Sequence, residues 1–257
     1  MAFAVIPGDG VRIHYEVEGD GPPLLLLSGL TVTIDAWRDL GYVDALRDAF
    51  TLVMPDSRGH GLSDKPREPD AYTLARMASD AIAVLDSLAI ERAHLFGYSM
   101  GAHVAYVAAH AHPSRFTSLI TGGGPLRSPC AIFEQLRPVL ELGPATLVKA
   151  FDQPPGSLPG SRRAQLLETD TEALLALITE RGKSWSLEAL LPEIPIPALV
   201  YAGENDGLHS DARRAAELLP NATFLSLPGL NHLQAMARAS VVLPHIQRFL
   251  GEAAPRS

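Results

Sequence analysis

A chain of 257 residues, 47% of them hydrophobic, can bury a sizeable core in one α/β domain or in two small ones. Its 21 Lys and Arg residues against 29 Asp and Glu residues leave a formal charge of −8 without any basic run, which argues against nucleic acid or an anionic membrane as partner. The single cysteine, Cys130, excludes a disulfide within the chain and favours a reducing compartment. The segment 1–7 lacks the basic region of a signal peptide, so we expect a cytoplasmic location.

The hydrophobic pattern predicts strands alternating with helices. Residues 3–6 and 11–17, separated by Pro7-Gly8-Asp9-Gly10, are typical of a hairpin with one solvated face. Later runs are apolar on both faces, as in buried parallel strands: 24–27, 51–54, 93–96, 116–120, 198–202 and 223–227. Helical spacing is found over 35–50, 72–88, 100–111, 211–219 and 239–250. The alternation predicts a doubly wound, mostly parallel eight-stranded sheet with helices on both faces and an antiparallel edge.

One segment interrupts this alternation after the sixth strand. From 125 to 197 the sequence shows helical patterns, over 132–142, 146–151 and 163–181, and no convincing strand. Because ligands bind at the carboxyl edge of open α/β sheets, a helical lid over that edge is the natural interpretation. We therefore expect a core made of residues 1–124 and 198–257 and a lid of residues 125–197.

The most informative motif is Gly97-Tyr98-Ser99-Met100-Gly101, between an apolar strand and a helix. So tight a bend leaves no room for a side chain at either glycine. The serine then stands at a helix N-terminus, where unpaired N–H groups favour a developing negative charge. A serine in this position is suited to attack a carbonyl carbon.

Two further residues follow in a suitable order. Asp206 and His232 each come just after a predicted strand, in loops rich in turn residues. The carboxyl ends of parallel strands share one edge of a sheet, so both can converge on Ser99. His232 would take the serine proton and return it to the leaving group, and Asp206 would orient the imidazole.

With these motifs the chain resembles the α/β-hydrolase superfamily, in its serine esterase and lactonase branch, whose order of catalytic residues is Ser, Asp, His. The loop 54–64 is similar to the family's loop after the fourth strand, and we expect its polar residues to brace the structure. The resemblance implies an oxyanion hole from the backbone N–H groups of Leu30 and Met100. Ser28 replaces the usual histidine before Gly29, as in some enol-lactone hydrolases, which favours a lactone.

The other candidate residues have structural interpretations. Asp211 opens a helix and Glu204 comes early in its turn, so both are weaker candidates for the acid than Asp206. His103 lies four residues after Ser99 and is more readily explained by burial than by catalysis. No metal or nucleotide motif is present, and we expect no cofactor. A pocket could be lined by apolar side chains near the loops and in the lid: Trp37, Phe133, Leu136, Leu140 and Trp185.

The sequence predicts a serine hydrolase acting on a small or medium carboxylic ester, lactone or thioester. Two alternatives stay open at this point. One is a C–C bond hydrolase, perhydrolase or lyase with the same three residues. The other is a small-molecule receptor with slow or no turnover. The sequence is also compatible with a homodimer.

Overall fold

The structure, a computed structural model, describes residues 1–253 and is built on one eight-stranded sheet in the order β1-β2-β4-β3-β5-β6-β7-β8. β1 and β2 are antiparallel to their neighbours, and the remaining strands pair in parallel. This confirms the predicted fold class. The strands are β1 (Ala2–Val5), β2 (Arg12–Glu18), β3 (Pro23–Leu27), β4 (Thr51–Pro55), β5 (Ala93–Tyr98), β6 (Phe116–Gly122), β7 (Ala198–Gly203) and β8 (Ala222–Leu227).

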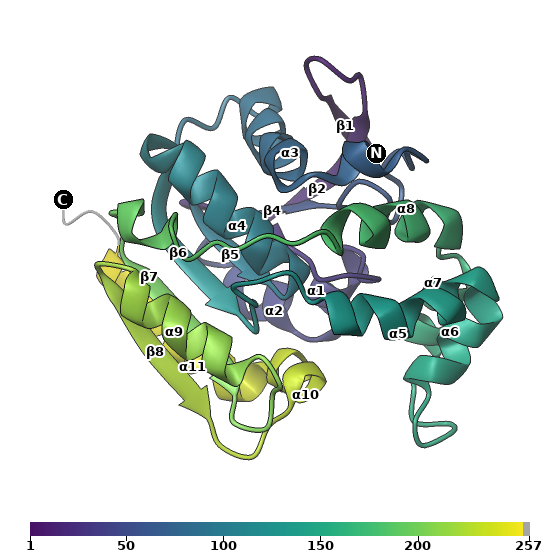
Figure 1. The fold of residues 1–257 in the computed structure, drawn as a ribbon. Helices are drawn as coiled ribbons and strands as arrows, with labels where there is room; N and C mark the ends of the chain where they lie inside the picture. Colours follow the sequence, from purple (N-terminus) through teal and green to yellow (C-terminus); the bar gives the residue numbers. More distant parts are fainter. Residues whose placement is uncertain (254–257) are drawn as a thin grey trace.

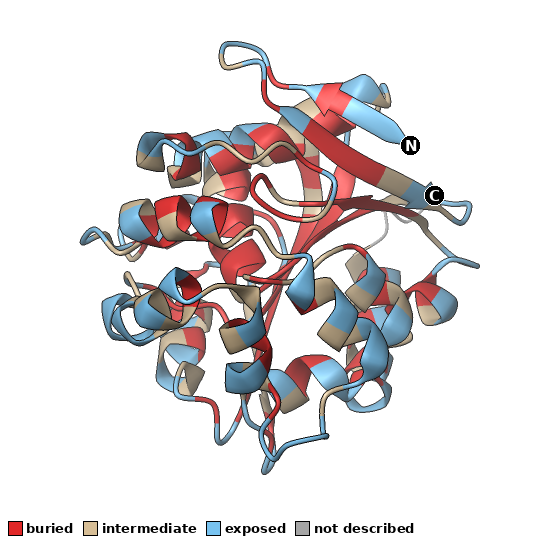
Figure 2. Cartoon of the chain, turned by 90° about the vertical axis from the view of Figure 1, so that its right-hand side faces the viewer, coloured by how far each residue is buried: buried red, intermediate tan, exposed pale blue. Residues whose placement is uncertain are grey.

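The central strands form the buried middle layer of the molecule (Figure 2). β3 lies between β4 and β5, with Leu24 opposite Leu52 on one side and His94 on the other. Every residue of β5 and β7 is buried, which explains why their sequences are apolar on both faces.

Helices cover both faces of this sheet (Figure 1). One core cluster contains Met77 of α3 and Val104 of α4, and the other contains Val43 of α2 and Val242 of α11. The α-helices are α1 (Asp35–Asp39), α2 (Tyr42–Leu46), α3 (Leu74–Ser87), α4 (Met100–Ala111), α5 (Cys130–Glu141), α6 (Pro144–Phe151), α7 (Gly160–Leu167), α8 (Thr171–Arg181), α9 (His209–Leu218), α10 (His232–Ala237) and α11 (Ala239–Ala253). Three 3₁₀ turns complete them: η1 (Pro69–Tyr72), η2 (Pro113–Arg115) and η3 (Leu191–Glu193).

Two of the predicted helices are each divided in the structure. The segment 35–50 forms α1 and α2, because Gly41 between them takes a φ of 82° that a continuous helix does not allow. The segment 163–181 forms α7 and α8, and Asp170 begins α8 by accepting a hydrogen bond from the Ala173 N–H at 3.0 Å.

Helices α5 to α8 lie between β6 and β7 in the chain and stand together on one side of the molecule (Figure 1). Their two connecting segments meet, since the Ser128 N–H donates to the Trp185 carbonyl at 3.2 Å and the Leu187 N–H donates to the Leu126 carbonyl at 2.9 Å. Backbone hydrogen bonds thus join the start and the end of this helical insertion, which we call the lid. The core expected from the sequence extends to residue 257, and residues 254–257 lie outside the described part of the chain.

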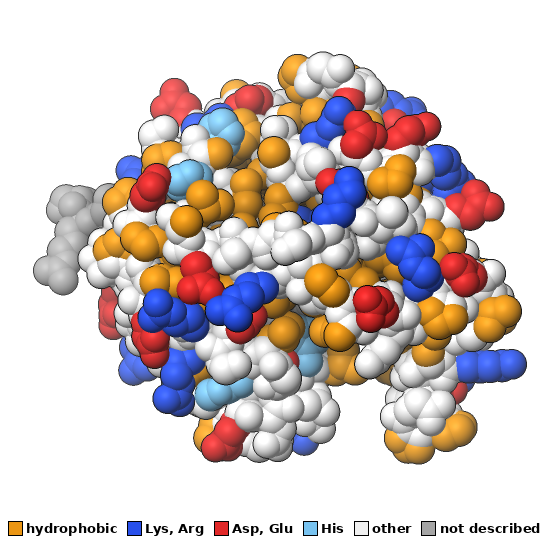
Figure 3. Space-filling model, viewed as in Figure 1, with side chains coloured by type: hydrophobic (Ala, Val, Ile, Leu, Met, Phe, Trp, Pro, Cys, Tyr) orange, Lys and Arg blue, Asp and Glu red, His pale blue; other side chains and the backbone are white. Residues whose placement is uncertain are grey.

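Acidic and basic side chains are intermingled on the face shown in Figure 3, with apolar atoms between them. Among residues 1–253, no helix has the length and apolar character that crossing a membrane requires.

Candidate active site

Ser99 lies on a sharp turn between β5 and α4. Its backbone has φ 53° and ψ −112°, a strained conformation with positive φ that residues other than glycine rarely adopt. A Cβ on Gly97 would lie 2.3 Å from the Gly101 carbonyl oxygen, and one on Gly101 would lie 2.0 Å from that of Leu27. Both glycines are thus required by close backbone approaches, as the sequence predicted.

The side chains of Ser99, His232 and Asp206 form one hydrogen-bonded series. The Ser99 Oγ lies 3.0 Å from His232 Nε2, and His232 Nδ1 lies 2.8 Å from Asp206 Oδ2. Asp206 follows β7, and His232 begins α10, where Asn231 and Gln234 form a capping box. The structure therefore brings together the three residues that the sequence singled out.

The surroundings of Asp206 decide which tautomer His232 adopts. The carboxylate is buried, and its Oδ1 accepts a hydrogen bond from the Leu208 N–H at 2.9 Å. Its Oδ2 accepts the Nδ1–H of His232, so Nε2 carries a lone pair toward Ser99. The arrangement can remove the serine proton and stabilise the imidazolium that results.

Asp211 and Glu204, the weaker candidates for the acid, have other partners. Asp211 Oδ2 accepts from the Leu126 N–H at 3.0 Å, at the base of the lid. Glu204 Oε2 accepts from the Gly229 N–H at 3.1 Å. Neither contact involves His232, so of these three acids only Asp206 is placed to orient it.

The two residues of the predicted oxyanion hole lie in segments adjacent to Ser99. Met100 begins α4, and the loop after β3 approaches so closely that a Cβ on Gly29 would lie 3.4 Å from Ser99 Cβ. Within residues 1–253, the backbone N–H groups of Leu30 and Met100 donate to no protein acceptor. Both are therefore free to stabilise an oxyanion.

Two side chains hold the loop after β3 in place, although Ser28 stands where the family usually has a histidine. Ser28 Oγ accepts from Trp37 Nε1 at 2.9 Å, and His60 Nε2 accepts from the Thr31 N–H at 3.0 Å. Burial lowers the pKa of His60, which keeps it neutral and able to accept. The assignment of Trp37 to the substrate pocket is wrong, since its side chain is fully buried, with the ring packed on Tyr42 and Phe96.

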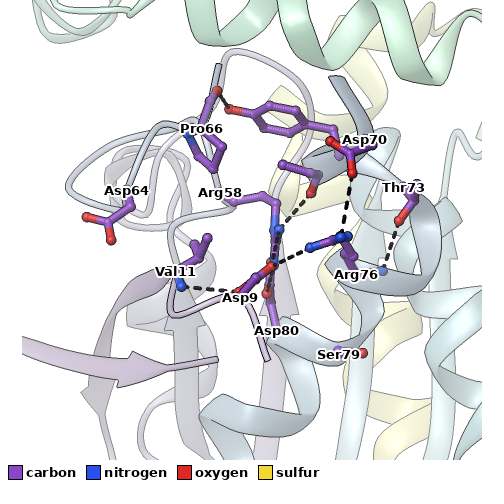
Figure 4. Close-up of polar contacts among 12 residues, drawn as sticks. Asp9, Val11, Arg58, Asp64, Pro66, Asp70, Thr73, Arg76, Ser79 and Asp80 are labelled. Carbon is purple, nitrogen blue, oxygen red and sulfur yellow. Dashed lines mark hydrogen bonds and ion pairs between the residues drawn. The ribbon is translucent and has the colours of Figure 1, made fainter. Parts of the chain in front are cut away.

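The polar residues of the loop after β4 support the fold, as expected. Asp56 accepts from the backbone N–H groups of Ile34 and Leu62, at 3.1 and 3.0 Å. Arg58 is fully buried and donates to Asp80 at 2.7 Å through Nε and to Asp9 at 3.0 Å through Nη1 (Figure 4). The contacts of Arg58 hold the loop against the turn between β1 and β2 and against α3.

Two side chains of α7, in the lid, form hydrogen bonds with Thr31, the residue after Leu30. Arg162 Nη2 donates to Thr31 Oγ1 at 2.8 Å and Nη1 donates to the Thr31 carbonyl, which also accepts from Gln165 Nε2 at 2.7 Å. Thr31 has a φ of 64°, a strained conformation for a β-branched residue. The lid thus stabilises the backbone that presents the Leu30 N–H.

Replacing Arg162 with Met is therefore expected to lower kcat about tenfold with little change in KM. Complete loss of an oxyanion donor lowers kcat by about 10²–10³-fold. The effect should be smaller here, because Gln165 would still donate to the Thr31 carbonyl. Steady-state kinetics on an aryl ester would measure the effect. Arg163→Met is the matched control, because Arg163 lies on the same helix and pairs with Asp152 within the lid. Equal kinetics for the two variants would contradict the positioning role of Arg162.

The other predicted pocket residues belong to the lid. Leu140 is buried in the core cluster, and Phe133, Leu136 and Trp185 are partly buried against it. One cavity, with a volume of about 470 Å³, lies between the loop after β4 and α7, with His60, Lys65 and Gln165 in its wall. A second, of about 20 Å³, lies beneath the loop after β4, against α3 and α4. Neither cavity is lined by Ser99 or by any predicted pocket residue, so an apolar pocket made by these lid side chains stays a prediction.

Sequence reasoning did not find Arg162, Gln165 or Arg181. Each is a polar residue on a lid helix, where such residues usually face water, and no local pattern indicates that it contacts the core. Among the residues that the structure describes, no group of three or more His, Cys, Asp or Glu side chains could hold a metal ion.

A model of the family described as alpha/beta hydrolase fold matches residues 22–191. "Epoxide hydrolase 3" from Siraitia grosvenorii is 33% identical over 113 residues, 44% of this chain and 35% of that protein. This chain thus spans about a third of that relative's length. "Putative carbamate hydrolase RutD" from Variovorax paradoxus is 29% identical over 260 residues, 93% of this chain and 96% of that protein.

Two solved structures are similar over almost the whole chain. A hydrolase from Pseudomonas aeruginosa PA01 has a TM-score of 0.85 and 26% identity, and the match covers 97% of this chain and 98% of that one. An enol-lactonase from Burkholderia xenovorans LB400 has a TM-score of 0.86 and 24% identity, covering 97% of this chain and 100% of that one. The second likeness shows the fold alone.

Proposed function

Since the chain belongs to the alpha/beta hydrolase fold family, we propose that it is a serine hydrolase that cleaves a small or medium carboxylic ester, lactone or thioester through an acyl-enzyme on Ser99. The observation that carries the proposal is the hydrogen-bonded series from Ser99 Oγ through His232 to Asp206, with distances of 3.0 and 2.8 Å. The single cysteine, Cys130, supports a cytoplasmic location.

The reaction begins when Ser99 Oγ attacks the substrate carbonyl and its proton passes to His232 Nε2. Asp206 stabilises the imidazolium through the Nδ1–H, and the Leu30 and Met100 N–H groups donate to the oxyanion. His232 then gives the proton to the leaving oxygen or sulfur as the bond to the carbonyl carbon breaks. A water molecule, deprotonated by His232, hydrolyses the acyl-enzyme and restores Ser99.

The nucleophile supports acyl chemistry over epoxide opening. An aspartate at position 99 would suit an alkyl-enzyme route to epoxides or haloalkanes, whereas a serine alkylated there would form a stable ether. The full-length likeness to the RutD protein, named as a carbamate hydrolase, is compatible with attack on a carbonyl carbon. A carbamate, which also has an acyl carbon, is therefore a second candidate substrate.

Labelling with a fluorophosphonate tests the nucleophile. The probe forms a phosphonyl ester with an activated serine, so the intact mass of the wild-type protein should increase by one probe adduct. Ser99→Ala should stay unlabelled, and Ser57→Ala, which changes a serine of the loop after β4, should label as wild type does. An unlabelled wild type, or equal labelling of Ser99→Ala, would overturn the proposal.

A further inference from the structure

Arg181, the last residue of α8, is a buried cation without a carboxylate partner. It is 2% exposed, and no Asp or Glu side chain among residues 1–253 forms an ion pair with it. Nη2 donates to His103 Nδ1 at 2.7 Å, while Nε and Nη1 have no hydrogen-bond partner. Burying an isolated charge is energetically unfavourable, so such a group requires an explanation.

His103 places this cation beside the catalytic residues. It lies in the first turn of α4, four residues after Ser99, which caps the N-terminus of that helix. Burial and the charges of Arg181 and His232 lower the pKa of His103 well below its usual value. His103 is therefore neutral, and since Nδ1 accepts from Arg181, its proton resides on Nε2.

The orphaned atoms of this cluster are all donors. They are Arg181 Nε, Arg181 Nη1 and His103 Nε2, each buried and without a partner among the described residues. Trp185 completes the cluster, with its ring 5.0 Å from the Arg181 guanidinium carbon and 5.0 Å from the His103 ring. Its own Nε1 is already paired with the Arg181 carbonyl at 2.9 Å.

We propose that Arg181 and His103 recognise a carboxylate on the substrate, so that the preferred ester or lactone is that of an acidic molecule. The inference rests on the proposed function and specifies its substrate class. Guanidinium N–H groups match carboxylate oxygens in geometry and charge. Burial lowers the pKa of Arg181 to about 9, so it stays positively charged at neutral pH. Both free nitrogens are closed to solvent, so bulk water does not satisfy them.

Paired substrates test this specificity. For a charge in the acyl part, 4-nitrophenyl hydrogen glutarate is compared with 4-nitrophenyl pentanoate, and for a charge in the alcohol part, 4-acetoxybenzoate is compared with phenyl acetate. In at least one pair, Arg181→Met should lower kcat/KM for the anionic substrate, relative to the neutral one, by about 30-fold or more, as expected when one partner of a buried charge pair is removed. Arg181→Lys, which keeps the charge, should lower this ratio of kcat/KM values less.

The control is Arg137→Met, on α5 of the same lid, because this partly exposed arginine contacts Thr179 and no catalytic residue. Its anionic-to-neutral ratios should equal those of the wild type. Ratios unchanged by Arg181→Met in both pairs would overturn the inference even with full activity on neutral esters, a result that leaves the proposed function intact. Absence of hydrolysis and of probe labelling in the wild type would instead refute the proposed function.

Binding without turnover gives an independent measurement. In the Ser99→Ala background, monomethyl glutarate should raise the melting temperature, and dimethyl glutarate should raise it less. Adding Arg181→Met should remove the difference between the two ligands. If the two esters act equally on Ser99→Ala, Arg181 does not recognise a carboxylate. Melting of Arg181→Met without ligand shows whether the variant is folded.

Discussion

Replacing Asp206 with Asn is expected to lower kcat by about 10⁴-fold without unfolding the protein. The Leu208 N–H, 2.9 Å from Asp206 Oδ1, would hold the amide oxygen of the asparagine. The amide nitrogen would then face His232 Nδ1 and donate to it. The imidazole proton would move to Nε2, which could no longer accept the proton of Ser99. Steady-state kinetics on an aryl ester, with a melting curve of the variant, would measure both parts of the expectation.

Asp211→Asn is the matched control for this variant. Asp211 accepts a hydrogen bond from the Leu126 N–H, and an asparagine oxygen can accept the same bond. Its kcat should stay within a few-fold of the wild-type value. If Asp206→Asn kept near-normal turnover while Asp211→Asn lost it, the acid would have to be reassigned.

The largest effect on stability is expected at Arg58. This side chain is fully buried and donates to Asp80, to Asp9 and, at 2.6 Å, to the Ala71 carbonyl (Figure 4). Arg58→Met leaves the Asp80 carboxylate buried with no cation beside it. Breaking a buried ion pair in this way lowers the free energy of unfolding by about 3–5 kcal/mol. Equilibrium unfolding in urea would measure the loss.

Arg76 offers a control within the same cluster. It pairs with Asp9 at 3.2 Å but is 43% exposed, so Arg76→Met should cost about 1 kcal/mol or less. The double variant Arg58→Met/Asp80→Asn should be less destabilised than the sum of the two single variants, because the buried charge is also removed. Strict additivity, or equal losses for Arg58→Met and Arg76→Met, would show that the Arg58–Asp80 pair does not stabilise the fold as described.

The fold and the three central site residues could be predicted because their signals are local. Apolar runs and helical spacing defined the strands and helices, and Gly97 and Gly101 marked a bend too tight for side chains. Asp206 and His232 could be chosen because each follows a strand at its carboxyl end. Parallel strands bring such ends to one edge, so position along the chain sufficed to place them near Ser99.

The predictions about the pocket were weaker because they depended on which way a side chain points. Trp37 lies near the Ser28-Gly29-Leu30 loop in sequence, yet α1 directs its ring beneath that loop, onto Phe96. The helix is only five residues long, too short for its hydrophobic pattern to define a buried face. Proximity in sequence was therefore an unreliable guide to the substrate site.

The sequence by itself determined the sheet, the turn at Ser99 and the order of the catalytic residues, because backbone sterics and short-range patterns control these features. Only the tertiary structure decided that Arg162 supports the oxyanion loop and that Arg181 lies buried beside His103. Both arginines are on lid helices, more than 60 residues from Ser99. A charged residue on a helix carries no local sign of burial, since burial depends on how distant segments pack. The contacts that lid residues make near Ser99 thus depend on the long-range packing of the lid.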